Sequence, residues 1–312
     1  MTITQLQYVL AVAEHQNFTL AAEKSFVTQP TLSMQVQKLE EELDILIFDR
    51  SKKPIGITEV GAKIVAQAKS IINESNRIKD IVDQEKGFIG GEFTLGIIPT
   101  IMPTLLPMFL KTFINKYPKV NLIIKEKNTE NLIRNLQDGH LDAAIAATPL
   151  EIEFIKERPL YYEPFVGYVP ENHRLGKATK INPKDLDIND ILLLRDGHCF
   201  RENIINLCNA PKNFKEDHFQ LQSGSFETLI NLSNEGLGMT LLPFLNTMEL
   251  DDRKKKNLKL FENPSPAREV SLIYHKSELK IQITDALHEV ISRVVRGAIA
   301  FQDVKIISPL NR

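Results

Sequence analysis

The sequence predicts an α/β protein in three parts: an N-terminal helical unit, one long helix, and a larger part in which strands and helices alternate. Up to about residue 86, hydrophobic residues recur with helical spacing, and from Ile64 to Ile78 they recur every seven residues. After a glycine-containing break at residues 87–91, short apolar runs typical of strands alternate with helical segments. A chain of 312 residues is long enough for these parts to form separate domains.

The composition is that of an ordinary globular protein, with 43% hydrophobic and 25% charged residues. A formal net charge of −2 gives no support for nucleic-acid binding, so any such function must rest on geometry. The N-terminus lacks a basic segment and a small-residue cleavage site, and no apolar run approaches the ~18 residues of a membrane span. Two cysteines in this length fit a reducing compartment. We therefore expect a cytoplasmic protein that makes no membrane contact.

Three helices are expected before residue 45. The spacing of apolar residues predicts an amphipathic helix over residues 3–14. A second, short helix is expected from Thr19, as its capping residue, through Lys24. After a brief turn, Thr28 is expected to cap a third helix, with Pro30 in its first turn, where the missing N–H costs little.

The third helix presents two different faces. Its buried stripe is formed by Leu32, Val36, Leu39 and Leu43. The other face carries mostly uncharged hydrogen-bonding side chains: Gln29, Thr31, Ser33, Gln35 and Lys38. Two short helices, a tight turn and a third helix of this kind match a helix-turn-helix, in which Gln, Ser and Thr suit base edges. The alternative from periodicity alone is a three-helix scaffold with a polar surface.

Residues 47–58 are expected to form a hairpin wing beside these helices, because Pro54 and Gly56 lie between two short apolar runs. Its cations, Arg50, Lys52 and Lys53, would then lie on phosphates.

A long helix is expected from Thr58, its capping residue, to about residue 86. Ile64, Ile71 and Ile78 are spaced by seven residues, and Ala68, Ser75 and Val82 follow each of them four residues later. This pattern indicates a dimer-forming helix, which at ~1.5 Å per residue is roughly 40 Å long.

The larger part begins with an alternating pattern. Strands are expected at residues 93–98, 120–125 and 141–147, and helices at residues 105–116 and 130–137. This alternation implies right-handed crossovers and a parallel sheet, whose ligands bind beyond the carboxyl ends of the strands. Thr100 and Thr129 fall at those ends, where each hydroxyl is either a helix cap or a ligand group.

Near Pro164 the chain is expected to enter a second lobe. That lobe would contain both cysteines, a strand at 218–222, a helix at 226–234 and a strand at 239–242. A strand at 269–274 and a last helix at 278–296 would then return to the first lobe. Ligands in such an arrangement bind in the cleft between the lobes.

Both cysteines lie in the stretch RDGHCFRENIINLC. Cys199 follows a turn-forming run and opens a helical pattern, so a helix N-terminus together with Arg195, His198 and Arg201 is expected to favour its thiolate. Cys208 lies nine residues later, about 13 Å away if the segment is helical.

A disulfide requires Cα atoms roughly 4.4–6.8 Å apart. Joining the two sulfurs would therefore require this helix to unwind, which would convert oxidation into a change of shape. The alternative is two buried cysteines that act as small apolar residues.

The N-terminal region closely resembles the winged helix-turn-helix of LysR-type transcriptional regulators in the stretch FTLAAEKSFVTQPTLSMQVQKLEEELDILIFDR and the following GITEVGAKI. It departs from that pattern at Asp44, where a glycine usually ends the helix, and in a wing of sequence KKPIG. The resemblance implies DNA contacts by Thr19, Gln29, Pro30, Thr31, Ser33, Gln35, Lys38, Arg50, Lys52 and Lys53.

The same resemblance implies a domain organisation. Residues 1–58 would be the DNA-binding domain and residues 59–88 the dimerising linker helix. Residues 89–312 would be a regulatory domain like those of periplasmic binding proteins, with lobe I at about 89–163 plus 268–312 and lobe II at about 164–267. The expected assembly is a homodimer or homotetramer.

Around the cysteines, the chain resembles the peroxide-sensing members of that family, in the cysteine spacing, the preceding Gly-His and the following Phe. By this resemblance, hydrogen peroxide oxidises Cys199 to a sulfenic acid and Cys208, the resolving thiol, closes the disulfide. The side chains expected around the peroxide or the reduced sulfur are Thr100, Thr129, His198, His218 and Arg268.

The implied protein is a cytoplasmic, nucleoid-associated transcription factor rather than an enzyme, and it needs no metal or organic cofactor. Its implied partners are promoter DNA, hydrogen peroxide, RNA polymerase and a thioredoxin or glutaredoxin system that reduces it. Two alternatives are a LysR-type regulator that answers to a metabolite, with incidental cysteines, and a thiol peroxidase.

Overall fold

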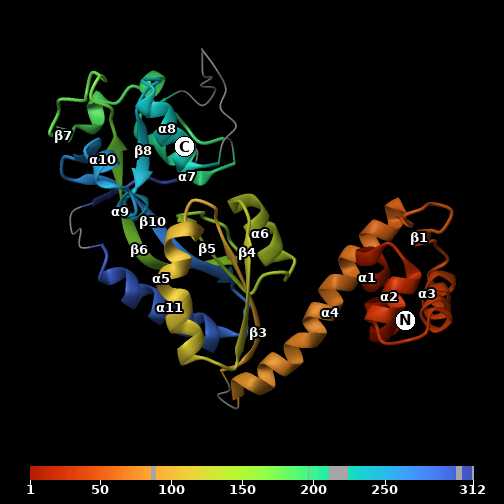
Figure 1. The fold of residues 1–312 in the computed structure, drawn as a ribbon. Coiled ribbons are helices and arrows are strands. Elements are labelled where there is room, and N and C mark those ends of the chain that lie inside the picture. The colour runs from red at the N-terminus through yellow and green to blue at the C-terminus, as the bar shows by residue number, and fades with distance from the viewer. Residues whose placement is uncertain (86–88, 196, 211–223, 300–303, 311–312) are drawn as a thin grey trace. The chain divides into compact units, whose positions relative to one another are not determined.

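The computed structural model describes residues 1–85, 89–195, 197–210, 224–299 and 304–310. The chain divides into two compact units, Met1–Lys86 and Gly87–Arg312 (Figure 1). The first unit contains the predicted helix-turn-helix and the long helix, and the second unit contains the α/β part and both cysteines.

The first unit has three short helices and a two-stranded wing, as expected: α1 (Ile3–His15), α2 (Phe18–Lys24), α3 (Gln29–Leu43), β1 (Phe48–Asp49) and β2 (Gly56–Ile57). The two strands of the wing are antiparallel. The predicted stripe of α3 is buried at Leu32, Val36 and Leu39, in one core with residues of α1 and α2.

The prediction that Thr19 caps α2 is wrong. Asn17 is the capping residue, and its Oδ1 accepts the backbone N–H groups of Thr19 at 2.8 Å and Leu20 at 3.1 Å. Asn17 has the extended backbone that a cap needs, and its short amide reaches back into the first turn. At the end of α3, Asp44 takes the left-handed conformation (φ 53°) that usually selects glycine.

Helix α4 (Glu59–Glu85) follows the wing. Thr58 caps it as predicted, since Thr58 Oγ1 accepts the Gly61 N–H at 2.9 Å. Val65 and Ala68 are buried in the core of the first unit. Further along the helix, the apolar side chains of Ile78 and Val82 are 65% and 44% exposed. The first part of the heptad pattern therefore packs within the unit, whereas its last part leaves apolar side chains exposed to solvent in the single chain.

The second unit is built on a mixed nine-stranded sheet in the order β4-β3-β5-β10-β6-β9-β7, with β11 paired to β10 and β8 to β6. Its strands are β3 (Gly91–Ile97), β4 (Val120–Glu126), β5 (Ala143–Thr148), β6 (Ile155–Tyr168), β7 (Lys180–Ile181), β8 (Thr240–Pro243), β9 (Leu258–Phe261), β10 (Ser265–His275) and β11 (Val304–Ile306).

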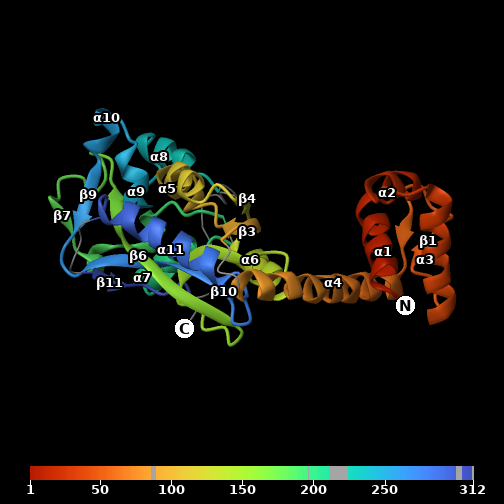
Figure 2. The ribbon, with the colours of Figure 1, turned by 90° about the horizontal axis from the view of Figure 1, so that it is seen from below.

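The parallel sheet predicted from the strands up to residue 147 is present in β3, β4 and β5. β10 runs antiparallel to β5 and to β6, because these long strands carry the chain from one lobe to the other and back. Figures 1 and 2 show β6 and β10 extending through both lobes.

The helices of the second unit are α5 (Met102–Lys116), α6 (Thr129–Gln137), α7 (Cys199–Leu207), α8 (Phe226–Asn234), α9 (Phe244–Met248), α10 (Asp252–Lys255) and α11 (Ile281–Arg296), with short 3-10 turns at Pro183–Asp185 and Ile188–Asp190. All the helices expected in this part are present, and the expected strand at 218–222 lies outside the described residues. Helices α5 and α11 pack on each other.

Each lobe of this unit has its own hydrophobic core. The first core is formed by β3, β5, α5, α6 and α11, and the second by the region from Phe165 to Phe261. Ile307 also belongs to the second core, so the expected placement of all of residues 268–312 in lobe I is wrong at the C-terminus. After α11 the chain crosses back, because β11 pairs with β10 and leads into lobe II.

Within the residues that the structure describes, there is no helix with the length and apolar character of a membrane span.

Glu278, just before α11, gives the stability of the second unit a pH dependence. Burial, followed by the charge of Asp142, raises the pKa of Glu278 to about 7. Because this value lies above that of the unfolded chain, the carboxyl group favours folding most at low pH and loses this contribution as pH rises from about 4.5 to about 7. A neutral isostere should therefore stabilise the protein above neutrality.

We expect Glu278→Gln to raise the free energy of unfolding at pH 8 by on the order of 1–3 kcal/mol and to have little effect at pH 5. The amide oxygen can still accept the backbone N–H groups of Leu279 and Lys280 that Glu278 Oε1 accepts now. Denaturant unfolding from pH 5 to 8 measures this difference, with Glu153→Gln, at an exposed position, as the control. Equal stabilisation at both pH values would contradict the assignment.

Candidate functional site

Cys199 is the first residue of α7, as the sequence predicts. Gly197, with φ +85°, makes the turn that precedes the helix, a conformation that side chains with a Cβ rarely adopt. The Cys199 side chain is only 8% exposed and packs in the core of lobe I, whereas Phe200 and Ile204 of the same helix pack in the core of lobe II. The start of α7 therefore bridges the two cores.

The electrostatics at the sulfur differ from the expectation. Burial raises the pKa of the Cys199 thiol, and the charge of Arg268, the hydroxyl of Thr129 and backbone groups of Ala147 and Phe200 lower it only in part. The net direction is upward, so the prediction that the thiolate is favoured is wrong for this conformation. The reason is that Cys199 opens the helix from inside a packed core, where an anion loses its hydration.

The cation that lowers the pKa of Cys199 is Arg268 of β10, and not one of the three basic residues near Cys199 in sequence. Arg201 Nη1 donates to the backbone carbonyl of Leu194 at 3.1 Å. Burial and then the charge of Arg195 lower the pKa of His198, which favours the neutral imidazole. The His198 side chain is buried, and its Nε2 accepts a hydrogen bond from Arg195 Nε at 3.3 Å.

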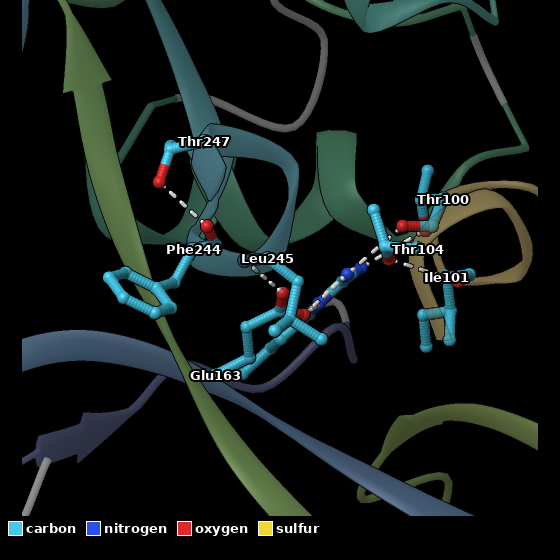
Figure 3. A network of polar contacts seen from close by, with 8 residues as sticks. Thr100, Ile101, Thr104, Glu163, Phe244, Leu245 and Thr247 are labelled. Carbon is cyan, nitrogen blue, oxygen red and sulfur yellow. Dashed lines mark hydrogen bonds and ion pairs between the residues drawn. The ribbon is translucent and has the colours of Figure 1, made fainter. Parts of the chain in front are cut away.

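Arg268 is fully buried in a network of hydrogen bonds. Figure 3 shows this network with Thr100, Glu163 and Leu245 labelled. Arg268 Nε and Nη2 donate to Glu163 Oε2 at 2.9 and 2.7 Å. Nη1 donates to Thr100 Oγ1 at 3.0 Å, and Nη2 donates to the Thr100 carbonyl at 3.1 Å. The other carboxylate oxygen of Glu163 accepts the backbone N–H of Leu245 at 3.0 Å. These bonds fix the guanidinium group, whose carbon also lies 5.3 Å from the centre of the Phe200 ring.

Neither Thr100 nor Thr129 is a helix cap, so the first of the two interpretations of these threonines is wrong. The residues at the cap positions of α5 and α6 are Ile101 and Asn128. The Thr100 hydroxyl accepts a hydrogen bond from Arg268. The buried Thr129 hydroxyl has no partner of ordinary hydrogen-bond geometry among the described residues. It is nevertheless close enough to the Cys199 sulfur to lower the pKa of this thiol. Thr129 therefore presents a polar atom to the thiol.

Cys208 caps the C-terminus of α7, and its backbone N–H donates to the Ile204 carbonyl at 3.0 Å. Burial and the nearby charge of Asp187 raise the pKa of Cys208 to about 12. Both cysteines are free, and the residues between them are helical. At ~1.5 Å rise per residue their Cα atoms are about 13 Å apart, well beyond disulfide range.

The structure brings Cys199, Thr129, Thr100 and Arg268 together, and it places Cys208 apart from them. His218 lies outside the described residues. Two buried groups were missed from the sequence: Glu163, and Tyr161, whose hydroxyl lies near the charges of Glu163 and Arg268. A carboxylate within the apolar run LYYEPFVGYV was the available signal, because a buried charge requires a partner.

The first unit presents most of the predicted DNA-contacting residues to solvent. The exposed ones are Thr19, Gln29, Pro30, Thr31, Lys38, Arg50, Lys52 and Lys53. Ser33 and Gln35 are half-buried, and Gln35 Oε1 accepts a hydrogen bond from Gln5 Nε2 at 3.4 Å. Arg50 donates to the buried Glu40 at 2.8 Å and lies over the Phe18 ring, so part of its guanidinium holds the wing in place.

Family models match both units. The model "Bacterial regulatory helix-turn-helix protein, lysR family" matches residues 3–62, and the "LysR substrate binding domain" model matches residues 86–296. The chain belongs to the LysR family of bacterial transcriptional regulators. Its two-unit fold, with a helix-turn-helix and a mixed α/β domain, is the fold predicted from the sequence.

Within this family the chain is similar to OxyR proteins. It is 33% identical to the "DNA-binding transcriptional dual regulator OxyR" of Escherichia coli K12 over 88% of this chain and 89% of that protein. It is also 33% identical to the "Hydrogen peroxide-inducible genes activator" of Pectobacterium carotovorum subsp. carotovorum, over 88% of this chain and 90% of that one.

Solved OxyR structures share the fold. A full-length OxyR variant from Pseudomonas aeruginosa matches with a TM-score of 0.74 and 33% identity, covering 94% of this chain and 98% of that one. A cysteine-to-serine variant of Corynebacterium glutamicum OxyR, bound to H2O2, matches with a TM-score of 0.62 and 28% identity, covering 96% of this chain and 94% of that one.

Arg268 generates a prediction for the ionisation of Cys199. We expect Arg268→Met to move the alkylation of Cys199 by iodoacetamide to higher pH, because the guanidinium is the charge that opposes the effect of burial on the thiol. The measurement uses a Cys208→Ser background, so that only Cys199 reacts. Arg195→Gln is the control and should leave the pH profile in place.

The same substitution leaves the Glu163 carboxylate buried without its partner, which should lower the free energy of unfolding by ~3–5 kcal/mol. Adding Glu163→Gln should recover part of this loss and provide a folded protein for the titration. An unchanged alkylation profile in that double variant would show that Arg268 does not act on the sulfur.

Proposed function

We propose that this protein is a peroxide-sensing transcriptional regulator, in which hydrogen peroxide oxidises Cys199 and a disulfide with Cys208 changes the conformation of the regulatory domain. The observation that carries the proposal is a buried thiol with a fixed guanidinium and an otherwise unpartnered hydroxyl beside it, on a helix that holds the second thiol out of reach. Similarity to OxyR proteins supports the same conclusion.

In the first step the sulfur of Cys199, as the thiolate, attacks one oxygen of hydrogen peroxide. The S–O bond forms, the O–O bond breaks, and the second oxygen leaves as hydroxide, which takes a proton and becomes water. The sulfur is oxidised by two electrons to sulfenic acid and the peroxide is reduced. Thr129 would orient the peroxide and Arg268 would stabilise the anionic sulfur, with Thr100 holding Arg268 in place.

In the second step the thiolate of Cys208 attacks the sulfenic sulfur of Cys199. The S–S bond forms, the S–O bond breaks, and the hydroxyl group leaves with a proton as water. This step requires α7 to lose its helical structure, because the helix fixes the sulfurs at its two ends. Oxidation is thereby converted into a rearrangement between the two cores that α7 contacts.

The change in the regulatory domain would alter how the subunits of a homodimer or homotetramer pack, and with them the spacing of the DNA-binding heads on the promoter. The exposed apolar residues of α4, Ile78 and Val82, are the proposed dimer contacts. RNA polymerase would be recruited by the oxidised form, and a thioredoxin or glutaredoxin system would reduce the disulfide. We propose residues 1–58, 59–88 and 89–312 as the DNA-binding, linker and regulatory parts.

We expect low micromolar peroxide to convert both free thiols of the purified protein to one disulfide, as measured by thiol labelling and mass spectrometry. Cys208→Ser should stop at the sulfenic acid, and Cys199→Ser should leave Cys208 reduced. The promoter footprint should differ between reduced and oxidised protein, and Cys199→Ser should keep the reduced footprint. Retention of both thiols after peroxide treatment would refute the sensing role.

Two other functions would give different results in these experiments. If the protein responds to a metabolite, the Cys199→Ser variant should still induce its target genes normally. A thiol peroxidase would turn over peroxide continuously with thioredoxin, whereas a sensor consumes one peroxide for each activation.

For the DNA-binding surface, we expect Gln29→Ala, in the first turn of α3, to lower affinity for the promoter site by ~1–3 kcal/mol while non-specific binding is retained. Lys53→Gln should weaken specific and non-specific binding alike and reduce the salt dependence by about one phosphate contact. Fluorescence anisotropy at several salt concentrations measures both. Gln7→Ala, at an exposed position on α1, is the control, and equal losses for Gln7 and Gln29 would contradict the assignment.

A further inference from the structure

The last described residues of the chain, 304–310, form a segment that we call the C-terminal tail, and it is bonded to the helix between the two cysteines. Asn203 Nδ2 donates to the backbone carbonyl of Ile307 at 2.6 Å. Asn206 Nδ2 donates to the carbonyls of Ser308 at 2.9 Å and Leu310 at 3.0 Å. Figure 2 shows β11, the start of this tail, near α7.

The tail is also fixed on its other side. β11 pairs in parallel with β10, and the Ile307 N–H donates to the Ala267 carbonyl at 2.8 Å. The Ile307 side chain is buried in the core of lobe II. The tail therefore connects β10, which carries Arg268, with α7, which carries Cys199, through hydrogen bonds to both.

The two asparagines reach the tail together only while α7 is helical. Residues 203 and 206 are three apart and so lie on one face of an α-helix, but they diverge when the helix unwinds. Asn203 is fully buried, and its Oδ1 has no hydrogen-bond partner within the described part of the chain. An apolar residue would fill this place at lower cost, so the amide is best explained by its bond to the tail.

We propose that Asn203 and Asn206 are positioning residues that, through the C-terminal tail, hold α7 in its reduced helical form and so set how readily the disulfide closes. This inference rests on the proposed function. Closing the disulfide unwinds the segment on which both asparagines lie, so their three hydrogen bonds to the tail break in the same event. The tail is then released from α7 in the oxidised protein.

The tail acts on one step only. The groups that act on the pKa of Cys199 are Arg268 of β10, Thr129 of α6, and backbone groups of Ala147 in β5 and Phe200 in α7, and none of the three tail carbonyls is among them. Oxidation of Cys199 to sulfenic acid should therefore not depend on the tail. Attack by Cys208 should depend on it, because this step needs the helix to open.

The test compares two shortened chains. A chain that ends at Ile307 lacks the carbonyls of Ser308 and Leu310 but keeps the buried Ile307 side chain and all of α7. A chain that ends at Leu310 keeps every acceptor and is the matched control. We expect the shorter chain to close its disulfide about tenfold faster after peroxide addition and to have a reduction potential about 30 mV more negative, the equivalent of tenfold for a two-electron couple.

The rate of sulfenic acid formation, measured with Cys208→Ser added to both chains, should be the same. Equal closure rates and potentials in the two chains would overturn the inference while leaving the proposed function intact. A purely structural role would instead lower the unfolding midpoint and leave the ratio of closure to sulfenic acid formation unchanged, which also overturns it. If neither chain forms a disulfide, the proposed function itself fails.

A second variant tests the side chain rather than the tail. Asn206→Asp keeps the shape but replaces the amide donor by an acceptor that repels the two carbonyls, and it should accelerate closure in the full chain as the truncation does. Hydrogen exchange of the full chain should show increased amide exchange at residues 304–310 upon oxidation. Unchanged exchange there would overturn the release of the tail.

Discussion

The geometry of one short helix sets the distance between the two cysteines of this protein. While Cys199–Leu207 is helical, the sulfurs of Cys199 and of the capping Cys208 are held at its opposite ends and no disulfide can form. The helix is stabilised from two directions, since the Cys199 side chain packs in the core of lobe I and Phe200 and Ile204 pack in the core of lobe II. Burial of a large apolar side chain is worth ~1.5–3 kcal/mol, so opening the helix costs several kcal/mol. In the proposed mechanism, oxidation must supply this free energy.

Burial and charge act in opposite directions on the Cys199 thiol. Burial raises the pKa of Cys199, while Arg268 opposes that effect. Arg268 is itself shared with Glu163, whose carboxylate accepts two of its N–H groups. The guanidinium is thus fixed by the carboxylate and by Thr100, and it is available to an anion at the sulfur without having to move. Preorganised charge of this kind costs no rearrangement when the thiolate forms.

The sequence was sufficient for the local elements and for the family, because apolar spacing and the motifs are local properties. It predicted the helix-turn-helix, the wing, the long helix and the helical segment between the cysteines. It failed where a tertiary contact decides the outcome. The pKa of Cys199 depends on packing and on Arg268, 69 residues away in sequence. The antiparallel strands β6 and β10, and the return of Ile307 to lobe II, likewise depend on long-range pairing.

The same long-range pairing explains how a change at α7 can reach both lobes. β6 and β10 run antiparallel through the two lobes, and Glu163 and Arg268 are directly paired across them. The Arg268 guanidinium lies against Phe200 of α7, and β10 also carries the tail that Asn203 and Asn206 bind. Loss of the helix removes both of these contacts from β10, a strand that belongs to each lobe. In the proposed mechanism, an oxidation confined to ten residues would thereby act on a strand that contributes to both lobes.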